Sequence, residues 1–133
     1  MGARIIIFAL IFLSHSGFSQ EWIKDAEDDK YIVYSFKNYN QKKDGIITIW
    51  INAIYKEPLE KINGTIEYRQ AILLNINCNN YGTRVRQIIG YDKKDNILTN
   101  DNWDSITLNN YNFSPPGTAS FIQNRKVCER FNK

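Results

Sequence analysis

Few side chains in this chain are of the types that carry out covalent or metal chemistry. The sequence holds one histidine, His15, and two cysteines, Cys78 and Cys128. We expect His15 to leave with an N-terminal signal peptide, so the mature chain lacks the base of Ser-His-Asp and Cys-His sites and a histidine zinc ligand. Cys78 and Cys128 are expected to form a disulfide, since no histidine activates either thiol. These residues predict a protein that is not an enzyme and needs no cofactor or metal.

Carboxylates are the remaining candidates for chemistry. A carboxylate-only hydrolase needs two acidic side chains about 5 to 10 Å apart, and 14 acidic residues always allow some pair to meet that requirement. The acidic residues gather at two places, which are Asp25, Glu27, Asp28 and Asp29, and Asp92, Asp95, Asp101 and Asp104. The first cluster is typical of a solvated face beside a terminus. The second fits no EF-hand loop, because it has neither the glycine nor the closing glutamate, and we interpret it as ordinary loop.

Residues 1–19 have the features of a secretory signal peptide. Arg4 supplies a positive charge, a short apolar run follows over residues 5–13, and the small residues Gly17 and Ser19 precede the expected cleavage after Ser19. The apolar run is too short for a membrane span, which needs about 20 residues. No cysteine lies near the expected cut, so we expect no lipid anchor. The sequence predicts an exported protein that is periplasmic or secreted.

Composition predicts a single domain over residues 20–133. The chain is 43% hydrophobic and 14% aromatic, which suffices for one core at this length. Loss of Arg4 with the signal peptide leaves 16 basic against 14 acidic residues. A balance this even argues against nucleic acid as a partner.

Alternating apolar residues predict an antiparallel sheet. The longest run, residues 65–78, places Ile72, Leu74, Ile76 and Cys78 on one face, as expected of a strand with one buried side. Further strands are expected at residues 31–36, 46–55, 83–92 and 97–98. The resulting sheet has about five to six strands.

The strand expected over residues 46–55 has two apolar faces. Ile47, Ile49 and Ile51 share the phase that we expect in the core, and Trp50 lies in the other phase, which we expect to be half-covered. A tryptophan in a strand more often packs beneath a neighbouring loop or helix than serves as an exposed binding residue. Both interpretations stay open for Trp50.

Residues 65–78 and 83–92 are expected to pair as a hairpin. The expected register places Arg69 opposite Asp92 and puts Val85, Ile89 and Tyr91 on the inner face. The outer face then carries a basic patch formed by Arg69, Arg84 and Arg86. Such a patch is either a solvated sheet face or, together with Trp50, the surface that binds a partner.

A C-terminal helix is expected after the strand-breaking residues 115–117. Thr118 or Ser120 is the expected N-cap, and Ser120 with Gln123 has the spacing of a capping box. Cys128 falls on the same helical face as two phenylalanines, so Cys78 and Cys128 would join the sheet to the helix. The fold class is therefore α+β, an antiparallel sheet packed by a C-terminal helix with one sheet-to-helix disulfide.

Several of these features, taken in order, resemble the surface-adhesin protein E-like family. They are Trp50 in a β-run, Tyr55 and Pro58, the strand ending in Cys78, the arginine-rich return strand to Tyr91 and Asp92, Phe113, Pro116-Gly117-Thr118 and Val127-Cys128. The resemblance covers nearly the whole mature chain and implies dimerisation, and for the namesake a surface lipoprotein that binds host matrix and serum proteins. This chain departs from the family in lacking the lipobox cysteine, so surface display through a lipid anchor is not carried over.

Two functions follow as hypotheses. The first is a non-enzymatic exported binding module of the surface-adhesin E-like type, which binds a host or envelope protein. The alternative is a structural or assembly protein of the envelope that acts as a homo-oligomer. Saturable binding of a protein partner favours the first, and a concentration-dependent oligomer favours the second.

Overall fold

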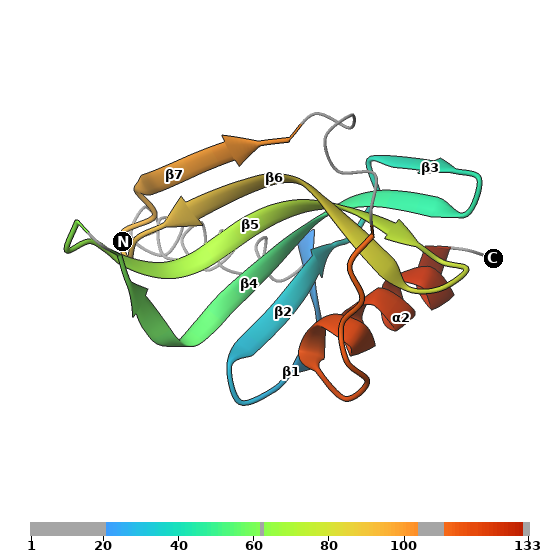
Figure 1. Cartoon of the computed structure of the whole chain (residues 1–133), viewed down its shortest axis with the longest axis horizontal. Helices are drawn as coiled ribbons and strands as arrows, with labels where there is room; N and C mark the ends of the chain where they lie inside the picture. The colour runs from blue at the N-terminus through green and yellow to red at the C-terminus, as the bar shows by residue number, and fades with distance from the viewer. Residues whose placement is uncertain (1–20, 62, 104–110, 132–133) are drawn as a thin grey trace, which may run out of the picture.

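In the computed structural model, which describes residues 21–61, 63–103 and 111–131, seven strands form one antiparallel sheet and a C-terminal helix packs on it (Figure 1). The strands are β1 Trp22–Glu27, β2 Tyr31–Phe36, β3 Gln41–Lys43, β4 Ile46–Glu60, β5 Ile66–Asn77, β6 Gly82–Tyr91 and β7 Ile97–Asn102, and the helix is α2 Ala119–Phe131. Their order in the sheet is β1-β2-β4-β5-β6-β7, and β3 pairs with β4. The predicted fold class is confirmed, with β1 and β3 as strands that the sequence analysis did not anticipate.

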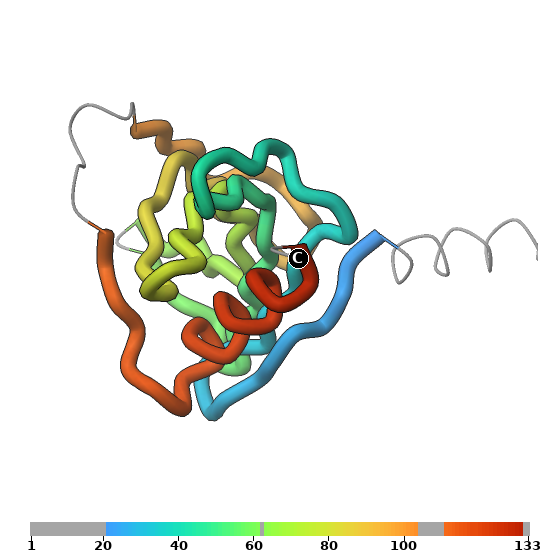
Figure 2. Tube along the Cα trace, turned by 90° about the vertical axis from the view of Figure 1, so that its right-hand side faces the viewer, coloured from blue at the N-terminus to red at the C-terminus, as the bar shows by residue number. Residues whose placement is uncertain are grey.

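The core lies between β4, β5 and α2. Ile47, Ile49 and Ile76 are fully buried and contact Val127 and Cys128 of the helix. Burial of one such aliphatic side chain contributes about 1.5 to 3 kcal/mol. In Figure 2, β1 passes on one side of α2 and residues 111–118 on the other. The predicted core phase of β4 is confirmed.

The predicted disulfide joins the end of β5 to α2. Cys78 and Cys128 are bonded, with 5.5 Å between their Cα atoms and 50 residues between them in sequence. On the chain-entropy argument, a loop of this length adds about 4 kcal/mol to the free energy of unfolding. The bond lies at the edge of the core cluster, where it fixes the helix against the strand.

The interpretation of the first acidic cluster as a solvated face is wrong for Asp25. A β-bulge in β1 between Lys24 and Ala26 accommodates the Asp25 side chain, which is fully buried. Its Oδ1 accepts a hydrogen bond from Arg130 Nη2 at 2.7 Å, and its Oδ2 accepts one from Gln123 Nε2 at 3.2 Å. A buried carboxylate is tolerated only when it is paired and hydrogen-bonded, so Asp25 is a structural link between β1 and α2.

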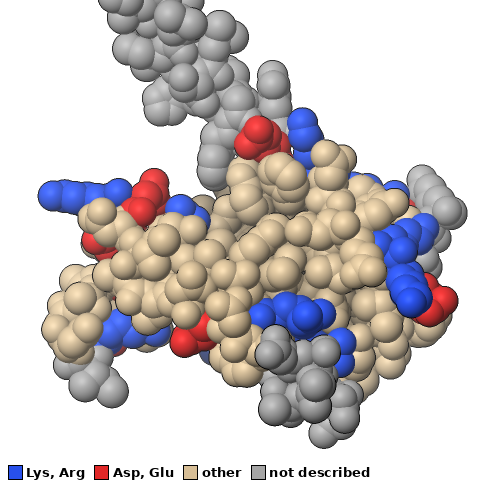
Figure 3. Space-filling view, turned by 90° about the horizontal axis from the view of Figure 1, so that it is seen from above, with Lys and Arg blue, Asp and Glu red and all other residues tan. Residues whose placement is uncertain are grey.

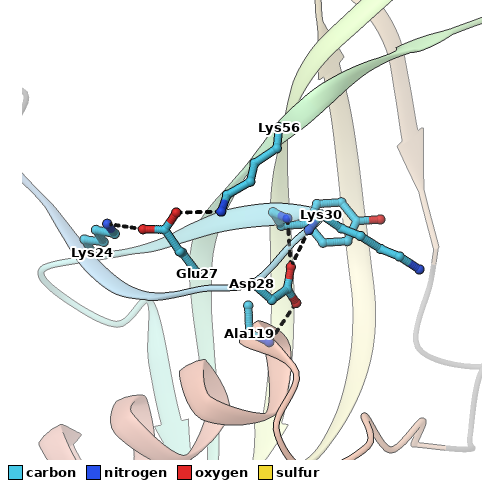
Figure 4. A network of polar contacts seen from close by, with 7 residues as sticks. Lys24, Glu27, Asp28, Lys30, Lys56 and Ala119 are labelled. Atoms are coloured by element: carbon cyan, nitrogen blue, oxygen red, sulfur yellow. Dashed lines mark hydrogen bonds and ion pairs between the residues drawn. The ribbon is translucent and has the colours of Figure 1, made fainter.

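Asp28 is the second exception, because it caps the helix from a distant part of the chain (Figure 4). Its Oδ2 accepts the backbone N–H of Ala119 at 2.9 Å, while Oδ1 accepts the N–H groups of Lys30 and Tyr31. These backbone donors, with that of Ala119 contributing most, lower the pKa of the Asp28 carboxyl. A carboxylate at this position satisfies one of the N–H groups that a helix start leaves open and also favours the helix dipole.

Glu27 is exposed and holds two lysines (Figure 4). Its carboxylate lies 2.8 Å from Lys24 Nζ and 2.7 Å from Lys56 Nζ. Hydrogen bonds from these ammonium groups lower the pKa of Glu27 to about 2. Glu27 therefore conforms to the solvated interpretation that fails for Asp25.

Thr118 is confirmed as an N-cap of α2. Its Oγ1 accepts the N–H of Phe121 at 3.3 Å, the bond expected from the residue before the first helical turn. The capping box of Ser120 and Gln123 is not formed, because the Gln123 side chain turns inward to Asp25. Ser120 is also the second residue of the helix, so it lies past the capping position.

The register of the β5–β6 hairpin differs from the prediction. A β-bulge lies between the pairs Leu74–Val85 and Leu73–Gln87, so Arg86 is the extra residue. One extra residue reverses the alternation beyond it. Val85 consequently faces the helix, whereas Ile89 and Tyr91, both predicted for the inner face, turn to the opposite face of the sheet.

Candidate functional site

Directly opposed residues of an antiparallel sheet share a face, so the register assigns each side chain to one of two faces. Trp50 is opposite Leu73, and Asn52 is opposite both Tyr34 and Ala71, on the side away from α2. We call this side the open face, because the elements in the described residues leave it without a covering layer. Its apolar side chains include Trp22, Ile32, Tyr34, Phe36, Trp50, Ile54, Ala71, Leu73, Ile89 and Tyr91.

Most of these apolar side chains are half-buried. They pack against one another across the sheet, and none is covered by α2, which packs on the other side. Figure 3 views the molecule from above, away from α2, and shows a broad uncharged surface with the Lys and Arg side chains towards its margins. A sheet face that contacts only water usually carries polar side chains, and this face is more apolar than that.

A hollow of about 340 Å³ lies in the middle of the open face. Its lining residues, which we call the aromatic hollow, are Trp22, Phe36, Trp50, Ala71, Ile89 and Tyr91. The rings of Trp22 and Phe36 meet edge to face with 5.3 Å between their centroids. Trp50 is therefore not packed beneath the helix, and of the two interpretations left open, the structure favours partial exposure in a hollow.

A second hollow, of about 310 Å³, lies on the same face next to the first and is polar. Its lining residues, which we call the basic hollow, are Gln41, Lys43, Asp44, Ile46, Thr48, Asn75, Arg84 and Arg86. Thr48 Oγ1 donates a hydrogen bond of 2.8 Å to Asn75 Oδ1 and so fixes its floor. The Arg84 guanidinium also lies over the ring of Tyr111, 5.3 Å from its centroid.

Arg69 does not join Arg84 and Arg86, so the predicted single basic patch is wrong. Arg69 lies six residues along β5 from Asn75, the partner of Arg84, which corresponds to roughly 20 Å. The predicted Arg69–Asp92 pair is wrong as well, because the hairpin turn pairs Asn77 with Gly82 instead of Arg84, and this register places Tyr91 opposite Arg69.

Arg69 is instead fixed by three neighbours. Its Nε lies 3.1 Å from Asp95 Oδ1, its Nη1 donates to Asn52 Oδ1 at 3.0 Å, and its guanidinium stacks 3.8 Å above the centre of the Tyr91 ring. Asn52 is buried in the open face. Arg69 therefore forms one border of the aromatic hollow.

The turn after β6 holds Asp95 in place. Asp95 adopts a left-handed backbone with φ of 64°. Asp92 accepts the Asn96 N–H through Oδ1 and the Asn96 side-chain amide through Oδ2. These hydrogen bonds lower the pKa of Asp92. The second acidic cluster thus acts as a turn in its first half, and Asp104 lies outside the described residues.

A third hollow bears on the carboxylate hypothesis. It measures about 260 Å³ and its lining includes Asp29 and Glu57. Both carboxylates are exposed, whereas a carboxyl that acts as an acid near neutral pH needs burial to raise its pKa. This arrangement favours a solvated surface over a hydrolytic site.

One fully buried carboxylate occurs elsewhere, at Glu67. Its Oε1 accepts a hydrogen bond of 2.8 Å from the Tyr55 hydroxyl, and its Oε2 lies 3.4 Å from Lys61 Nζ. Burial, followed by this hydrogen bond, raises the pKa of Tyr55. A Cβ at Gly90 would clash with Glu67 Oε2, so the position of the buried Glu67 side chain over Gly90 requires glycine there. We interpret the Tyr55–Glu67 pair as structural.

Sequence reasoning identified Trp50, Arg84 and Arg86 but missed the other five members of the aromatic hollow. Trp22 was missed because β1 looked like a charged terminus, and Ile89 and Tyr91 were assigned to the wrong face because a bulge leaves no clear signal in an alternating pattern. Phe36 was recoverable, since Ile32, Tyr34 and Phe36 share one phase of residues 31–36.

Two further features are absent from the part of the chain that the structure describes. It contains no group of three or more His, Cys, Asp or Glu side chains placed to hold a metal ion. None of its helices is long and apolar enough to cross a membrane.

No family model matches the chain, and searches of curated proteins and of solved structures find no match either. The resemblance to the surface-adhesin protein E-like family therefore stays a prediction. The function has to be argued from the open face itself.

Proposed function

We propose that this protein is a non-enzymatic exported binding module of the surface-adhesin E-like type, which binds a host or envelope protein through its open face. The observation that carries the proposal is the aromatic hollow, in which Trp22, Phe36, Trp50 and Tyr91 share one concave site on a rigid sheet. The proposal extends to export through a signal peptide at residues 1–19, which lie outside the described residues.

Residue types at this site suit protein recognition. Trp, Tyr and Arg are the side chains that most often dominate binding energy at protein interfaces, and they do so in pockets that exclude water. The open face supplies all three, as Trp50, Tyr91 and Arg69. Because these side chains belong to paired strands, the site loses little conformational freedom when a partner binds.

The charge around the hollow indicates the kind of partner. Lys43, Arg84 and Arg86 lie at one end of the open face and Arg69 at another. The whole sequence has a net charge of +3. A partner with an apolar centre and acidic surroundings would match this face, and opposite charges would speed its association.

The disulfide supports export, because such bonds persist in oxidising compartments. Cys78 and Cys128 are bonded in the core. The alternative function, a homo-oligomer of the envelope, would use the same open face with a second copy as its occupant. It is therefore an outcome of the same experiment.

Affinity capture with matched variants tests the proposal. The mature protein and its Trp50→Ala and Phe113→Ala variants are immobilised and exposed to a native envelope extract and to a panel of matrix proteins. Phe113 is an aromatic residue with 65% exposure that lies outside the aromatic hollow. We expect saturable capture of a defined protein by the wild type and by Phe113→Ala, and its loss with Trp50→Ala.

Two results would overturn the binding proposal. One is the absence of any capture above background, and the other is capture that Trp50→Ala leaves unchanged. Light scattering of the free protein runs in parallel. A concentration-dependent dimer that Trp50→Ala dissociates would assign the open face to a second copy and favour the alternative function.

A further inference from the structure

We propose that the basic hollow binds a carboxylate of the protein partner, on an extended segment whose neighbouring apolar side chain enters the aromatic hollow. The inference rests on the proposed function for the identity of the ligand. It adds the chemistry of the recognised segment, in which an apolar residue and an Asp or Glu are two positions apart, in either order.

The first argument is charge. Lys43, Arg84 and Arg86 line the basic hollow against one acidic residue, Asp44. The Nε atom of Arg86 is buried and has no hydrogen-bond partner in the described part of the chain. A buried donor without an acceptor is unfavourable, and a ligand oxygen at this point would supply the acceptor. Arginine forms its strongest hydrogen bonds with anionic oxygens.

The second argument is spacing. Thr48 in the basic hollow and Trp50 in the aromatic hollow are two residues apart on β4. Their cross-strand partners on β5 are Asn75 and Leu73. Two residues of a strand span about 7 Å, which is also the distance between side chains i and i+2 on one side of an extended ligand. An extended segment can therefore fill both hollows with alternate side chains.

The third argument concerns the type of anion. Arginine pairs with carboxylate and with phosphate, so the guanidinium groups alone do not decide between them. Asp44 in the lining reduces the positive charge of the hollow, which favours a singly charged carboxylate over a phosphate with two charges. Asp and Glu are the residues through which a protein partner presents that group.

The experiment uses blocked pentapeptides with the sequence Gly-Phe-Ser-Glu-Gly and, as a matched control, Gly-Phe-Ser-Gln-Gly. Each is titrated into the isotope-labelled mature protein while backbone amide shifts are recorded. We expect the Glu peptide to shift the amides of Thr48, Trp50 and Arg86 saturably. We expect the Gln peptide to bind at least about fivefold more weakly, because the charge-assisted hydrogen bond is lost.

Three variants locate the effect. Arg86→Gln should remove the preference for Glu over Gln, and Lys43→Gln, at an exposed site, should reduce it without affecting the fold. Arg125→Gln is the control, because Arg125 is an exposed helix residue, 47% accessible, that lies outside the hollow. It should leave the preference unchanged. A well-dispersed amide spectrum shows that each variant is folded.

Every other outcome would count against the inference. Equal binding of the two peptides, shifts confined to other surfaces, or no shift at millimolar peptide would show that the hollow does not recognise carboxylate. Saturable shifts at the basic hollow with inorganic phosphate or with phosphatidylglycerol vesicles, but not with the Glu peptide, would assign it to phosphate. Because the peptides need no natural partner, this result is independent of whether the capture experiment succeeds.

Discussion

At the scale of single residues, Arg69 shows how tertiary contacts redirect a charged side chain. The expected cross-strand partner was Asp92, but the hairpin turn sets a register that places Tyr91 opposite Arg69, and Asp95 forms the ion pair instead. The Asp95 side chain is 71% exposed, and an exposed ion pair contributes little. The buried Asn52 and the Tyr91 ring are therefore the stronger partners of Arg69.

We predict that Arg69→Ala lowers the free energy of unfolding by about 2 kcal/mol. The loss combines a stacking interaction of about 0.5 to 1 kcal/mol with a hydrogen bond of about 1 kcal/mol to a buried amide. Asp95→Ala, which removes only the exposed ion pair, should cost at most about 1 kcal/mol. Urea titrations of both variants measure the difference, and equal losses would show that the ion pair dominates.

At the scale of elements, the turn between β1 and β2 supplies a cap for the helix at the other end of the chain. Asp28 and Ala119 are 91 positions apart in sequence and share a hydrogen bond of 2.9 Å. With the buried Asp25–Arg130 pair, this contact ties the edge strand β1 to α2. Polar side chains therefore determine how the helix sits on that flank of the sheet.

We predict that Asp28→Ala lowers the free energy of unfolding by about 1 to 2 kcal/mol at neutral pH, as for other helix caps. Asp29→Ala is a matched control, since Asp29 is an exposed neighbour, and it should cost less than about 0.5 kcal/mol. Denaturant melts of the two variants give the comparison. Similar losses at both positions would mean that the cap contributes nothing specific.

Stability at acid pH should depend on the same Asp28 contact. The folded-state pKa values of Asp28 and Glu27 lie below their ordinary values, so both groups stabilise the fold above the unfolded pKa and lose that contribution as pH falls through the folded pKa. For Glu27 this window runs from its ordinary pKa of 4.5 down to a pKa of about 2.

We therefore predict that the melting temperature falls between about pH 5 and pH 2, and that it falls less steeply in Asp28→Asn. Calorimetric scans across this pH range would measure both slopes. Parallel pH profiles for the wild type and the variant would show that the Asp28 cap does not couple folding to protonation.

At the scale of the whole molecule, one covalent bond and one uncovered surface define the protein. The disulfide holds α2 against β5 on one side of the sheet, and the open face lies on the other side. Changes to the bond should therefore alter stability without altering the surface that we propose for binding.

We predict that reduction of Cys78–Cys128 lowers the free energy of unfolding by about 4 kcal/mol. The folded protein should keep its ability to bind a partner, because the bond lies on the helix side of the sheet. Thiol labelling of the unfolded, oxidised protein should find no reactive thiol, and labelling after reductant should find two. Two reactive thiols before reduction would show that the bond does not form in solution.

The last prediction for the whole molecule concerns cleavage of the signal peptide. We expect cleavage after Ser19, so that the exported protein begins at Gln20. Intact-mass measurement of the protein recovered outside the cytoplasm checks this directly. A mass that retains Met1 or Arg4 would remove the basis for export.

The sequence by itself determined the features that depend on local periodicity. Alternation over residues 46–55 and 65–78 predicted β4 and β5 with their core faces, and the pattern after Pro116 predicted α2 and its Thr118 cap. The disulfide followed from the presence of two cysteines alone. The strands, the helix and its cap depend on residues that are close in sequence. The disulfide depends on neither cysteine having another cysteine as an alternative partner.

The tertiary structure decided where those periodicities break. The bulge at Arg86 turned Ile89 and Tyr91 to the open face, and the bulge at Asp25 allowed a carboxylate in a charged segment to be buried against Arg130. A bulge depends on how two strands pack together and on the layer beneath them. The sequence of one strand alone therefore does not predict it. For this reason the aromatic hollow, which gathers residues of β1, β2, β4, β5 and β6, exists only once the sheet has formed.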